Sequence, residues 1–310
     1  METGMTKLII DTDPGIDDAM AIFYAAAAPD IELLGLTTIF GNVTTKTATR
    51  NALRLLEKAG LDLPVAKGAD VPLMLPPFTP SAHVHGEEGF GDIPAEAPKG
   101  QAITEDAADF LIRMAREHKG ELVVCPIGPL TNIAHAIQRD PEFVKNVKRI
   151  VIMGGSLEEG GNITPYAEAN IYHDPHGADV VFGSGGNIVM VGLDVTHRIL
   201  CTKEDFTSIA GQSPDLGGML QEMSKFYLHF YETVGKFDGC SLHDPAAVIA
   251  CTHPELFETR SVPLTVTCEG EESGATVVDP ESLRAGTAVC MGVQSEKVKN
   301  LFLQRLALLP

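Results

Sequence analysis

The sequence predicts an α/β protein: an open, mostly parallel sheet with helices on both faces and a Rossmann-like core. Short apolar runs bounded by turn residues alternate with longer amphipathic segments, which indicates repeated strand–helix units. The runs at 122–125, 149–153 and 188–191 are almost wholly apolar, as expected for strands buried on both faces. No repeat, low-complexity tract or linker divides the 310 residues. We therefore expect a single domain over 1–310, with 1–5 as a disordered lead-in.

An apolar run and a chain break predict the first strand and the first helix. Leu8, Ile9 and Ile10 form a short apolar run, which is typical of a buried strand. Pro14-Gly15 then breaks the chain, and Asp17-Asp18 opens an Ala-rich helix.

The remaining elements follow in the same alternation. Residues 71–100 are rich in Pro and Gly, and an irregular segment of that length is usually functional, often as a lid. The polar stretch 158–174 is expected to be a loop, 202–239 to be mainly helical, and Leu242 to Pro245 to cap a helix at 246–251. Further strands are expected at 31–40, 63–66, 262–268 and 276–278, and the last two should form an antiparallel pair. Further helices are expected at 44–59, 104–118 and 295–308, and one more should precede the strand at 149–153.

The amino-acid composition indicates which binding partners and which cellular compartment to expect. The net charge of −19 argues against nucleic acids and anionic membranes, because both bind through basic patches. No apolar run is long enough to span a bilayer, and no secretory signal pattern opens the chain. The six cysteines include no Cys-x-x-Cys pair, so we expect reduced thiols in a cytoplasmic protein.

Asp11, Asp13, Asp17 and Asp18 crowd four carboxylates into the eight residues that follow the first strand. Ligands of open α/β sheets bind at the carboxyl ends of the strands. Carboxylates this close repel one another, which raises their pKa values unless a cation lies between them. Because this run supplies only carboxylate oxygens as ligands, the pattern indicates a Ca²⁺ or Mg²⁺ site. The simpler interpretation, that Asp17 and Asp18 only cap a helix, leaves the other two unexplained.

Two other sites with similar acidic runs fit less well. An EF-hand loop that began at Asp11 would need Gly and Glu where Ile16 and Ile22 stand. A haloacid dehalogenase-type phosphatase also begins strand-Asp-x-Asp, but it normally continues with Gly-Thr, where this chain has Pro14-Gly15. That phosphatase, with Asp11 as nucleophile, remains the alternative enzyme. A nucleoside- or Ca²⁺-binding module without catalysis is the non-enzymatic alternative.

Polar residues also follow other predicted strands. Right-handed connections would gather them at one edge of the sheet. Amides and carboxylates that alternate around a pocket suit an uncharged, polyhydroxylated ligand, since each hydroxyl both donates and accepts. Asn42 or Asn162 alone could equally be a turn residue beside Gly. The group consists of Asn42, Ile127-Gly128, Asn162, Glu168 and Asn170.

The Asp-Thr-Asp-Pro-Gly-Ile-Asp-Asp run of residues 11–18 resembles the signature of the inosine-uridine preferring nucleoside hydrolases. The matching motifs come in the family's order and cover about residues 7–250. The resemblance implies a nucleoside hydrolase-like fold, one Ca²⁺ per chain, and a homodimer or homotetramer. The further motifs are Gly41-Asn42, His85-Gly86-Glu87-Glu88-Gly89, Gly128-Pro129-Leu130-Thr131-Asn132, Met153-Gly154-Gly155, Asn162 with Glu168-Ala169-Asn170, and His243-Asp244-Pro245.

The same resemblance implies roles for individual residues. Asp13 would be the general base that activates a Ca²⁺-bound water, which then attacks a sugar of oxocarbenium-like character. Some relatives carry Thr at the position of Ile127, an exchange of no consequence for a ligand that is a main-chain oxygen. The implied Ca²⁺ ligands are Asp13, Asp18, Asp244 and the carbonyl of Ile127, and the implied ribose contacts are Asp17, Asn42, Met153, Asn162, Glu168 and Asn170.

The leaving base needs a proton or hydrogen bonds, and His243 is the candidate donor because histidine titrates near neutral pH. A structural histidine beside Asp244 is the alternative for this residue. His85 is expected to approach the base when its loop closes, with an exposed loop histidine as the alternative. Tyr227 and Tyr231 are spaced i,i+4 on one helix face. They would line the base side or pack in the core.

Together these residues predict hydrolysis of the N-glycosidic bond of ribonucleosides to ribose and free base. The chain has no Trp, whereas purine-specific relatives are thought to stack the base between indoles. We therefore expect a pyrimidine or non-specific preference, for uridine, inosine or cytidine, in a nucleoside salvage role.

Overall fold

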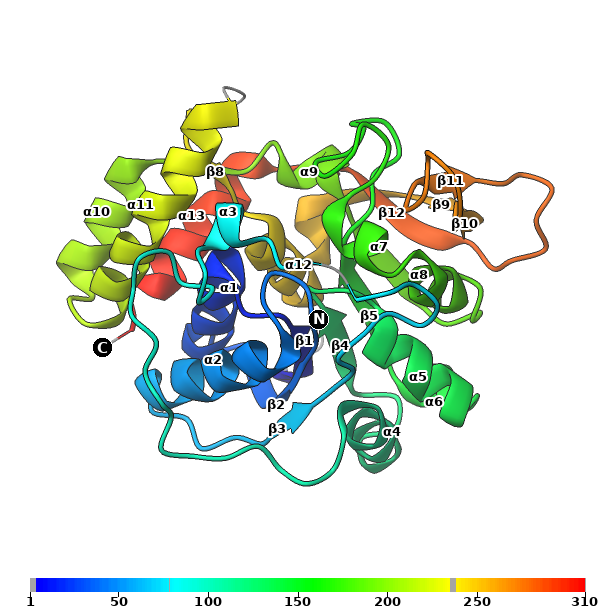
Figure 1. The fold of residues 1–310 in the computed structure, drawn as a ribbon, viewed down its shortest axis with the longest axis horizontal. Coiled ribbons are helices and arrows are strands. Elements are labelled where there is room, and N and C mark those ends of the chain that lie inside the picture. Colours follow the sequence, from blue (N-terminus) through cyan, green and yellow to red (C-terminus); the bar gives the residue numbers. More distant parts are fainter. Residues whose placement is uncertain (1–3, 78, 235–237, 310) are drawn as a thin grey trace.

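The computed structural model describes residues 4–77, 79–234 and 238–309, and an eight-stranded sheet forms the centre of this part (Figure 1). Seven strands run parallel, and only the edge strand β9 is antiparallel to its neighbour β12. The predicted open, mostly parallel sheet is confirmed. The spatial order is β3 (Val65–Lys67), β2 (Ile31–Thr38), β1 (Thr6–Thr12), β4 (Val123–Pro126), β5 (Arg149–Met153), β6 (Ile188–Val191), β12 (Thr287–Val293) and β9 (Phe257–Val262).

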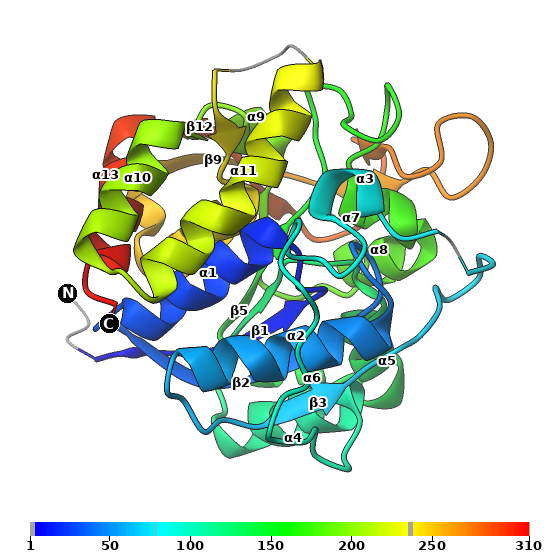
Figure 2. The same cartoon turned by 60° about the vertical axis from the view of Figure 1, so that its left-hand side comes forward.

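Two hydrophobic cores lie on the two faces of the sheet, because successive side chains of a strand point to opposite faces. Along β1, Leu8 and Ile10 pack in one core and Ile9 in the other. Figures 1 and 2 show α10, α11 and α13 grouped beside α1, with α4, α5 and α6 on the opposite side. The first core takes side chains from α1 (Ile16–Ala27), α2 (Thr45–Lys58), α10 (Lys203–Gln212), α11 (Leu216–Val234), α12 (His243–Thr252) and α13 (Ser295–Leu306); the second takes them from α4 (Ala107–Glu117), α5 (Thr131–Arg139), α6 (Phe143–Asn146), α7 (Ala169–His173) and α8 (Pro175–Phe182).

Smaller elements complete the described chain. The predicted antiparallel pair is confirmed as β10 (Leu264–Val266) with β11 (Thr276–Val278). A second pair joins β7 (Leu200–Cys201) to β8 (Cys240–Ser241). The short elements are α3 (Ala82–His85), α9 (Leu193–Thr196) and the 3₁₀ turn η1 (Pro254–Leu256).

Several predicted boundaries were wrong. Strands β9 and β12 had not been predicted, yet they extend the central sheet. The stretch expected to be a loop contains α7, because the Glu168 carboxylate accepts the N–H groups of Asn170 and Ile171 and caps that helix. Helix α12 begins at His243, so His243 and Asp244 form its first turn and do not precede it. The long Pro- and Gly-rich segment contains the short helix α3.

All six cysteines are free thiols, and only Cys268 is partly exposed. No helix in the described ranges is both long enough and apolar enough to cross a bilayer. Of the predicted lead-in, residues 1–3 lie outside the described residues, and Gly4 and Met5 precede β1.

Candidate functional site

A pocket of about 250 Å³ opens at the carboxyl ends of the central strands. It collects side chains from the starts of α1 and α12, from α3, α7 and α11, and from the segments that follow β4 and β5. All of the site residues proposed from the sequence line it except Asp13 and Asp18, which are fully buried. The proposed residues that line it are Asp17, Asn42, His85, Ile127, Met153, Asn162, Glu168, Asn170, Tyr227, Tyr231, His243 and Asp244.

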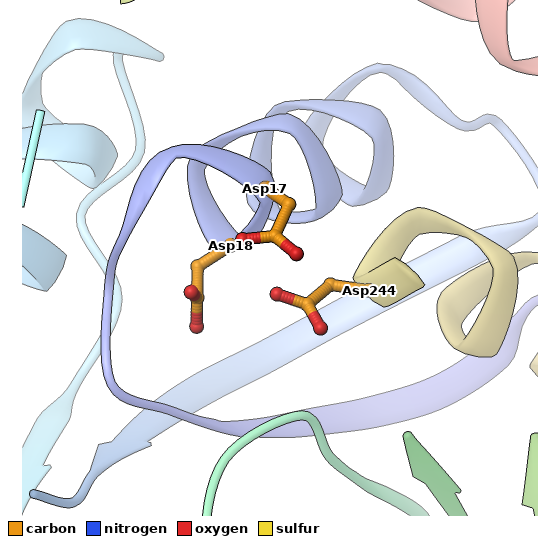
Figure 3. Close-up of side chains that lie close together, drawn as sticks. All are labelled: Asp17, Asp18 and Asp244. Carbon is orange, nitrogen blue, oxygen red and sulfur yellow. The ribbon is translucent and has the colours of Figure 1, made fainter. Parts of the chain in front are cut away.

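Three carboxylates from two helix starts converge at the pocket. One oxygen each of Asp17, Asp18 and Asp244 lies within 4.8 Å of the others, and Figure 3 shows the three groups turned toward one another. All three side chains are buried. Burial raises the pKa values of all three, and repulsion by neighbouring carboxylates adds to the rise for Asp244 and for Asp17, whose pKa reaches about 8.

Asp13 adjoins this cluster without being one of the three. Its Oδ2 accepts the N–H of Asn42 at 2.6 Å, and its buried Oδ1 has no hydrogen-bond partner within the described ranges. Burial, then the charges of Asp18 and Asp17, raise its pKa. Glycines make room for it, because a Cβ on Gly41 would lie 1.8 Å from Oδ2, and one on Gly128 would lie 2.5 Å from Oδ1.

Asp18 holds the turn between β1 and α1. Its Oδ1 accepts the Thr12 hydroxyl at 2.5 Å and the Asp13 N–H at 3.2 Å. Its Oδ2 accepts the Gly15 N–H and the Asn42 side-chain amide, both at 2.9 Å. These four donors fix the turn that presents the acidic cluster.

The donor set fits a hard cation. Among the described residues, those that line the pocket include no Lys or Arg that could balance the carboxylates there. The buried Oδ1 atoms of Asp13 and Asp17 lack hydrogen-bond partners among the described residues, and a cation would supply one. The ligands available are oxygens, which suit Ca²⁺ or Mg²⁺.

The side chains proposed to contact ribose are held by backbone groups. Glu168 accepts the N–H groups of Asn170, Gly155 and Ile171 at 2.9, 3.0 and 3.2 Å, and burial raises its pKa to about 7. The Asn170 amide donates to the carbonyl of Ile127 at 2.9 Å. The side-chain oxygen of Asn162 accepts the N–H of Ala169 at 3.0 Å.

Aromatic and imidazole groups form the other side of the pocket. Tyr231 OH lies 2.8 Å from Nε2 of His243, and Tyr227 OH donates to Asp17 at 3.2 Å. His85 stacks on Tyr227 with 5.5 Å between ring centroids, and its Nδ1 accepts the N–H of Ile16. His85 is therefore buried and is not an exposed loop residue.

Burial lowers the pKa values of His243 and His85 to about 3. The expectation that His243 titrates near neutral pH was therefore wrong, because sequence alone does not give its desolvation. At neutral pH His243 is an uncharged imidazole, which can still donate one hydrogen bond.

The sequence did not reveal several residues that line the pocket. Phe230 and Val234 share a helix face with Tyr227 and Tyr231, so their spacing could have identified them. His197 carried no signal, yet its ring packs edge-on against His243 at 5.5 Å. The other lining residues are Ser81, His83, Val84, Ile163 and Ala169.

Asp11 does not have the environment of a phosphatase nucleophile. Its Oδ1 accepts the Thr37 hydroxyl at 2.5 Å and the Asn132 side-chain amide at 2.7 Å. The side chain is fully buried and does not line the pocket. These contacts assign Asp11 a structural role that joins β1, β2 and α5.

Comparisons with known proteins agree with this geometry. The profile of the inosine-uridine preferring nucleoside hydrolase family matches residues 8–300. A probable uridine nucleosidase 2 of Arabidopsis thaliana is 44% identical over 279 residues, which cover 88% of this chain and 85% of that protein. The inosine-uridine preferring nucleoside hydrolase of Crithidia fasciculata is 36% identical, with 97% of each chain covered.

A solved structure of similar fold is the purine-preferring ribonucleoside hydrolase from Gardnerella vaginalis. Its TM-score is 0.94 at 36% identity, with 97% of this chain and 98% of that chain covered. The named preferences of these relatives thus range from uridine to purines. The chain belongs to the inosine-uridine preferring nucleoside hydrolases, a family of enzymes that hydrolyse the N-glycosidic bond of ribonucleosides.

Proposed function

We propose that this enzyme uses Ca²⁺ and Asp13 to hydrolyse pyrimidine ribonucleosides, or ribonucleosides without strict base preference, among them uridine, cytidine and inosine. The observation that carries the proposal is the set of buried carboxylates at the base of the pocket, whose described lining residues include no Lys or Arg. Without a cation the carboxylates repel one another, and Asp17 and Asp244 line the pocket that would hold the sugar.

Asp13, Asp18, Asp244 and the Ile127 carbonyl would hold the cation. A donor set that mixes carboxylates with a main-chain carbonyl favours Ca²⁺, which accepts more numerous and less regular oxygen ligands than Mg²⁺. When bound, the cation supplies positive charge that lowers the pKa of water and orients ribose hydroxyls.

The chain's own groups supply the remaining chemistry. The unpartnered Oδ1 of Asp13 can accept the proton of the attacking water. Asp17 and Asn42, with Asn162, Glu168 and Asn170, would bind the ribose hydroxyls and Met153 would lie beneath the sugar. The carboxylates of Asp17 and Glu168 would stabilise the positive charge that develops on the ring as the bond breaks.

The neutral imidazole of His243 would donate a hydrogen bond to the departing base. A neutral donor is sufficient, because the departing base carries negative charge that an N–H stabilises in a water-poor pocket. Tyr231 contacts His243, and His85 and Tyr227 lie beside it. They would form the base-contacting wall.

The proposed base preference rests on the size of the side chains that line the pocket. His83, Phe230, Tyr231 and Val234 are compact or single-ring side chains, and the chain has no Trp to sandwich a purine. In the part of the chain that the structure describes, the pocket lining offers no Lys or Arg to a 5′-phosphate, which favours nucleosides over nucleotides. The relative named for uridine supports the pyrimidine side of the proposal.

We also infer a cytoplasmic enzyme of nucleoside salvage that assembles as a homodimer or homotetramer. The six free cysteines support a reducing compartment. The charge of −19 supports a small-molecule partner over nucleic acid or an anionic membrane.

A reducing-sugar assay tests the proposal. Purified protein is incubated with uridine, cytidine, inosine, adenosine and uridine 5′-monophosphate, before and after prolonged chelation and with Ca²⁺ or Mg²⁺ restored. We expect ribose release from uridine that is lost on chelation and restored best by Ca²⁺, with no release from the nucleotide. Absence of release from every nucleoside would support a binding module, and full activity after complete metal removal would exclude the proposed cofactor.

A further inference from the structure

Helix α9 brings a hydroxyl to the side of His243 that faces away from Tyr231. Thr196 Oγ1 lies 2.8 Å from Nδ1 of His243, and both residues are buried. The two residues lie 47 positions apart in the sequence, on different helices. His243 thus has an oxygen partner at each ring nitrogen, the Thr196 hydroxyl at Nδ1 and the Tyr231 hydroxyl at Nε2.

The direction of these hydrogen bonds follows from the Thr196 hydroxyl. Among the described residues, the partner found for Thr196 Oγ1 is Nδ1 of His243. The usual competing acceptor for a helical threonine, the carbonyl four residues earlier, is that of Gly192, which already accepts the N–H groups of Val195 and Thr196. Because a buried hydroxyl needs an acceptor for its proton, Thr196 donates to Nδ1.

The assignment at Nδ1 fixes the other ring nitrogen. A ring nitrogen that accepts a hydrogen bond carries no proton, so the imidazole proton of His243 lies on Nε2. The Tyr231 hydroxyl oxygen, 2.8 Å from Nε2, then accepts the Nε2–H.

We propose that Thr196 is a positioning residue: its hydroxyl donates to Nδ1 of His243 and so keeps the imidazole proton on Nε2, the nitrogen beside the pocket-lining Tyr231. Its relevance to catalysis rests on the proposed function, in which His243 donates to the departing base. With the proton on Nδ1, His243 would point a lone pair at that base and could not stabilise its charge. Because a ring nitrogen without a proton cannot donate, the choice of tautomer decides whether His243 can act on the base.

Three variants test the role in the Ca²⁺-loaded protein. Thr196→Val keeps the shape and removes the hydroxyl, Thr196→Ser keeps the hydroxyl, and Thr207→Val is the control. Thr207 donates to the carbonyl of Lys203 on the exposed surface of α10. Thr196→Val should lower kcat for uridine by about 10-fold, as expected when a proton donor is misoriented. It should leave p-nitrophenyl riboside nearly unchanged, since that leaving group needs no donor.

Thr196→Ser should restore most of the activity on uridine, and Thr207→Val should match the wild type on both substrates. Equal losses of Thr196→Val on both substrates, or no rescue by Thr196→Ser, would overturn the positioning role.

A spectroscopic readout separates this inference from the proposed function. ¹⁵N NMR of the imidazole rings distinguishes the two neutral tautomers, and the His243 signals are those that disappear in His243→Gln. We expect wild type and Thr196→Ser to carry the proton on Nε2, and Thr196→Val to show a mixture. A proton on Nδ1 in the wild type would overturn the inference even if uridine is hydrolysed. The Nε2 tautomer in a protein that cleaves no nucleoside would uphold the inferred orientation while the proposed function fails.

Discussion

Replacing Asp244 by asparagine should stabilise the chelated protein while weakening its response to Ca²⁺. Asp244 lies within 4.8 Å of both Asp17 and Asp18. Two full charges at that separation repel by about 3 kcal/mol at an effective dielectric constant of about 20. Partial protonation, which the raised pKa values indicate, relieves much of this energy. We therefore expect the variant to gain about 1–3 kcal/mol in the free energy of unfolding, or about 2–6 °C in Tm.

The assay is thermal unfolding followed by fluorescence or calorimetry, in chelator and across a Ca²⁺ titration. The wild type should gain stability with Ca²⁺, whereas Asp244→Asn should need a much higher concentration, since it loses a charged ligand. Asp179→Asn is the matched control, because Asp179 accepts two hydrogen bonds from Arg284, at 2.6 and 2.8 Å. It should be destabilised with and without Ca²⁺. A chelated Asp244→Asn protein that melts below the chelated wild type would refute the repulsion argument.

Two further predictions concern histidines. His243→Ala should lower kcat for uridine by about 100-fold but affect p-nitrophenyl riboside by less than about 5-fold, because only the first leaving group needs a donor; equal losses in steady-state assays would count against this role. Burial lowers the pKa of His173 to about 4, below the value of about 6.5 in the unfolded chain. The stability that the neutral, buried His173 contributes is therefore fully present above pH 6.5. It is lost as the pH falls toward 4, by up to about 3 kcal/mol in the free energy of unfolding. His173→Gln should therefore flatten the fall in unfolding free energy between pH 7 and pH 4.5, measured by urea denaturation, whereas the exposed His229→Gln should not; identical slopes in the two variants would be the contrary result.

The parts of the fold that the sequence predicts well are those with local signals. The buried parallel strands are continuous apolar runs, and the chain break at Pro14-Gly15 marks the turn before α1. Strands β9 and β12 were missed because they pair at the far edge of the sheet, and β12 includes small residues and Gly292. Their strand state depends on partners distant in sequence and is not encoded in a strong local pattern.

In the site, too, features of one short sequence segment were predicted, whereas contacts between distant segments were not. Asp13, Asp17 and Asp18 stand in one short run, so their crowding is visible in the sequence. The contact of Thr196 with His243 joins α9 to α12 and has no sequence signature. The low pKa of His243 likewise follows from burial by several elements, which no single segment reveals.

The most direct test of the central claim is turnover of Asp13→Ala. The claim is that the acidic cluster breaks the glycosidic bond with Asp13 as base, through its unpartnered Oδ1. Ribose release from uridine with saturating Ca²⁺ should fall by at least about 1,000-fold, the combined loss of a base and a metal ligand. Circular dichroism should show that the variant remains folded. A folded Asp13→Ala protein with turnover close to that of the wild type would contradict the claim.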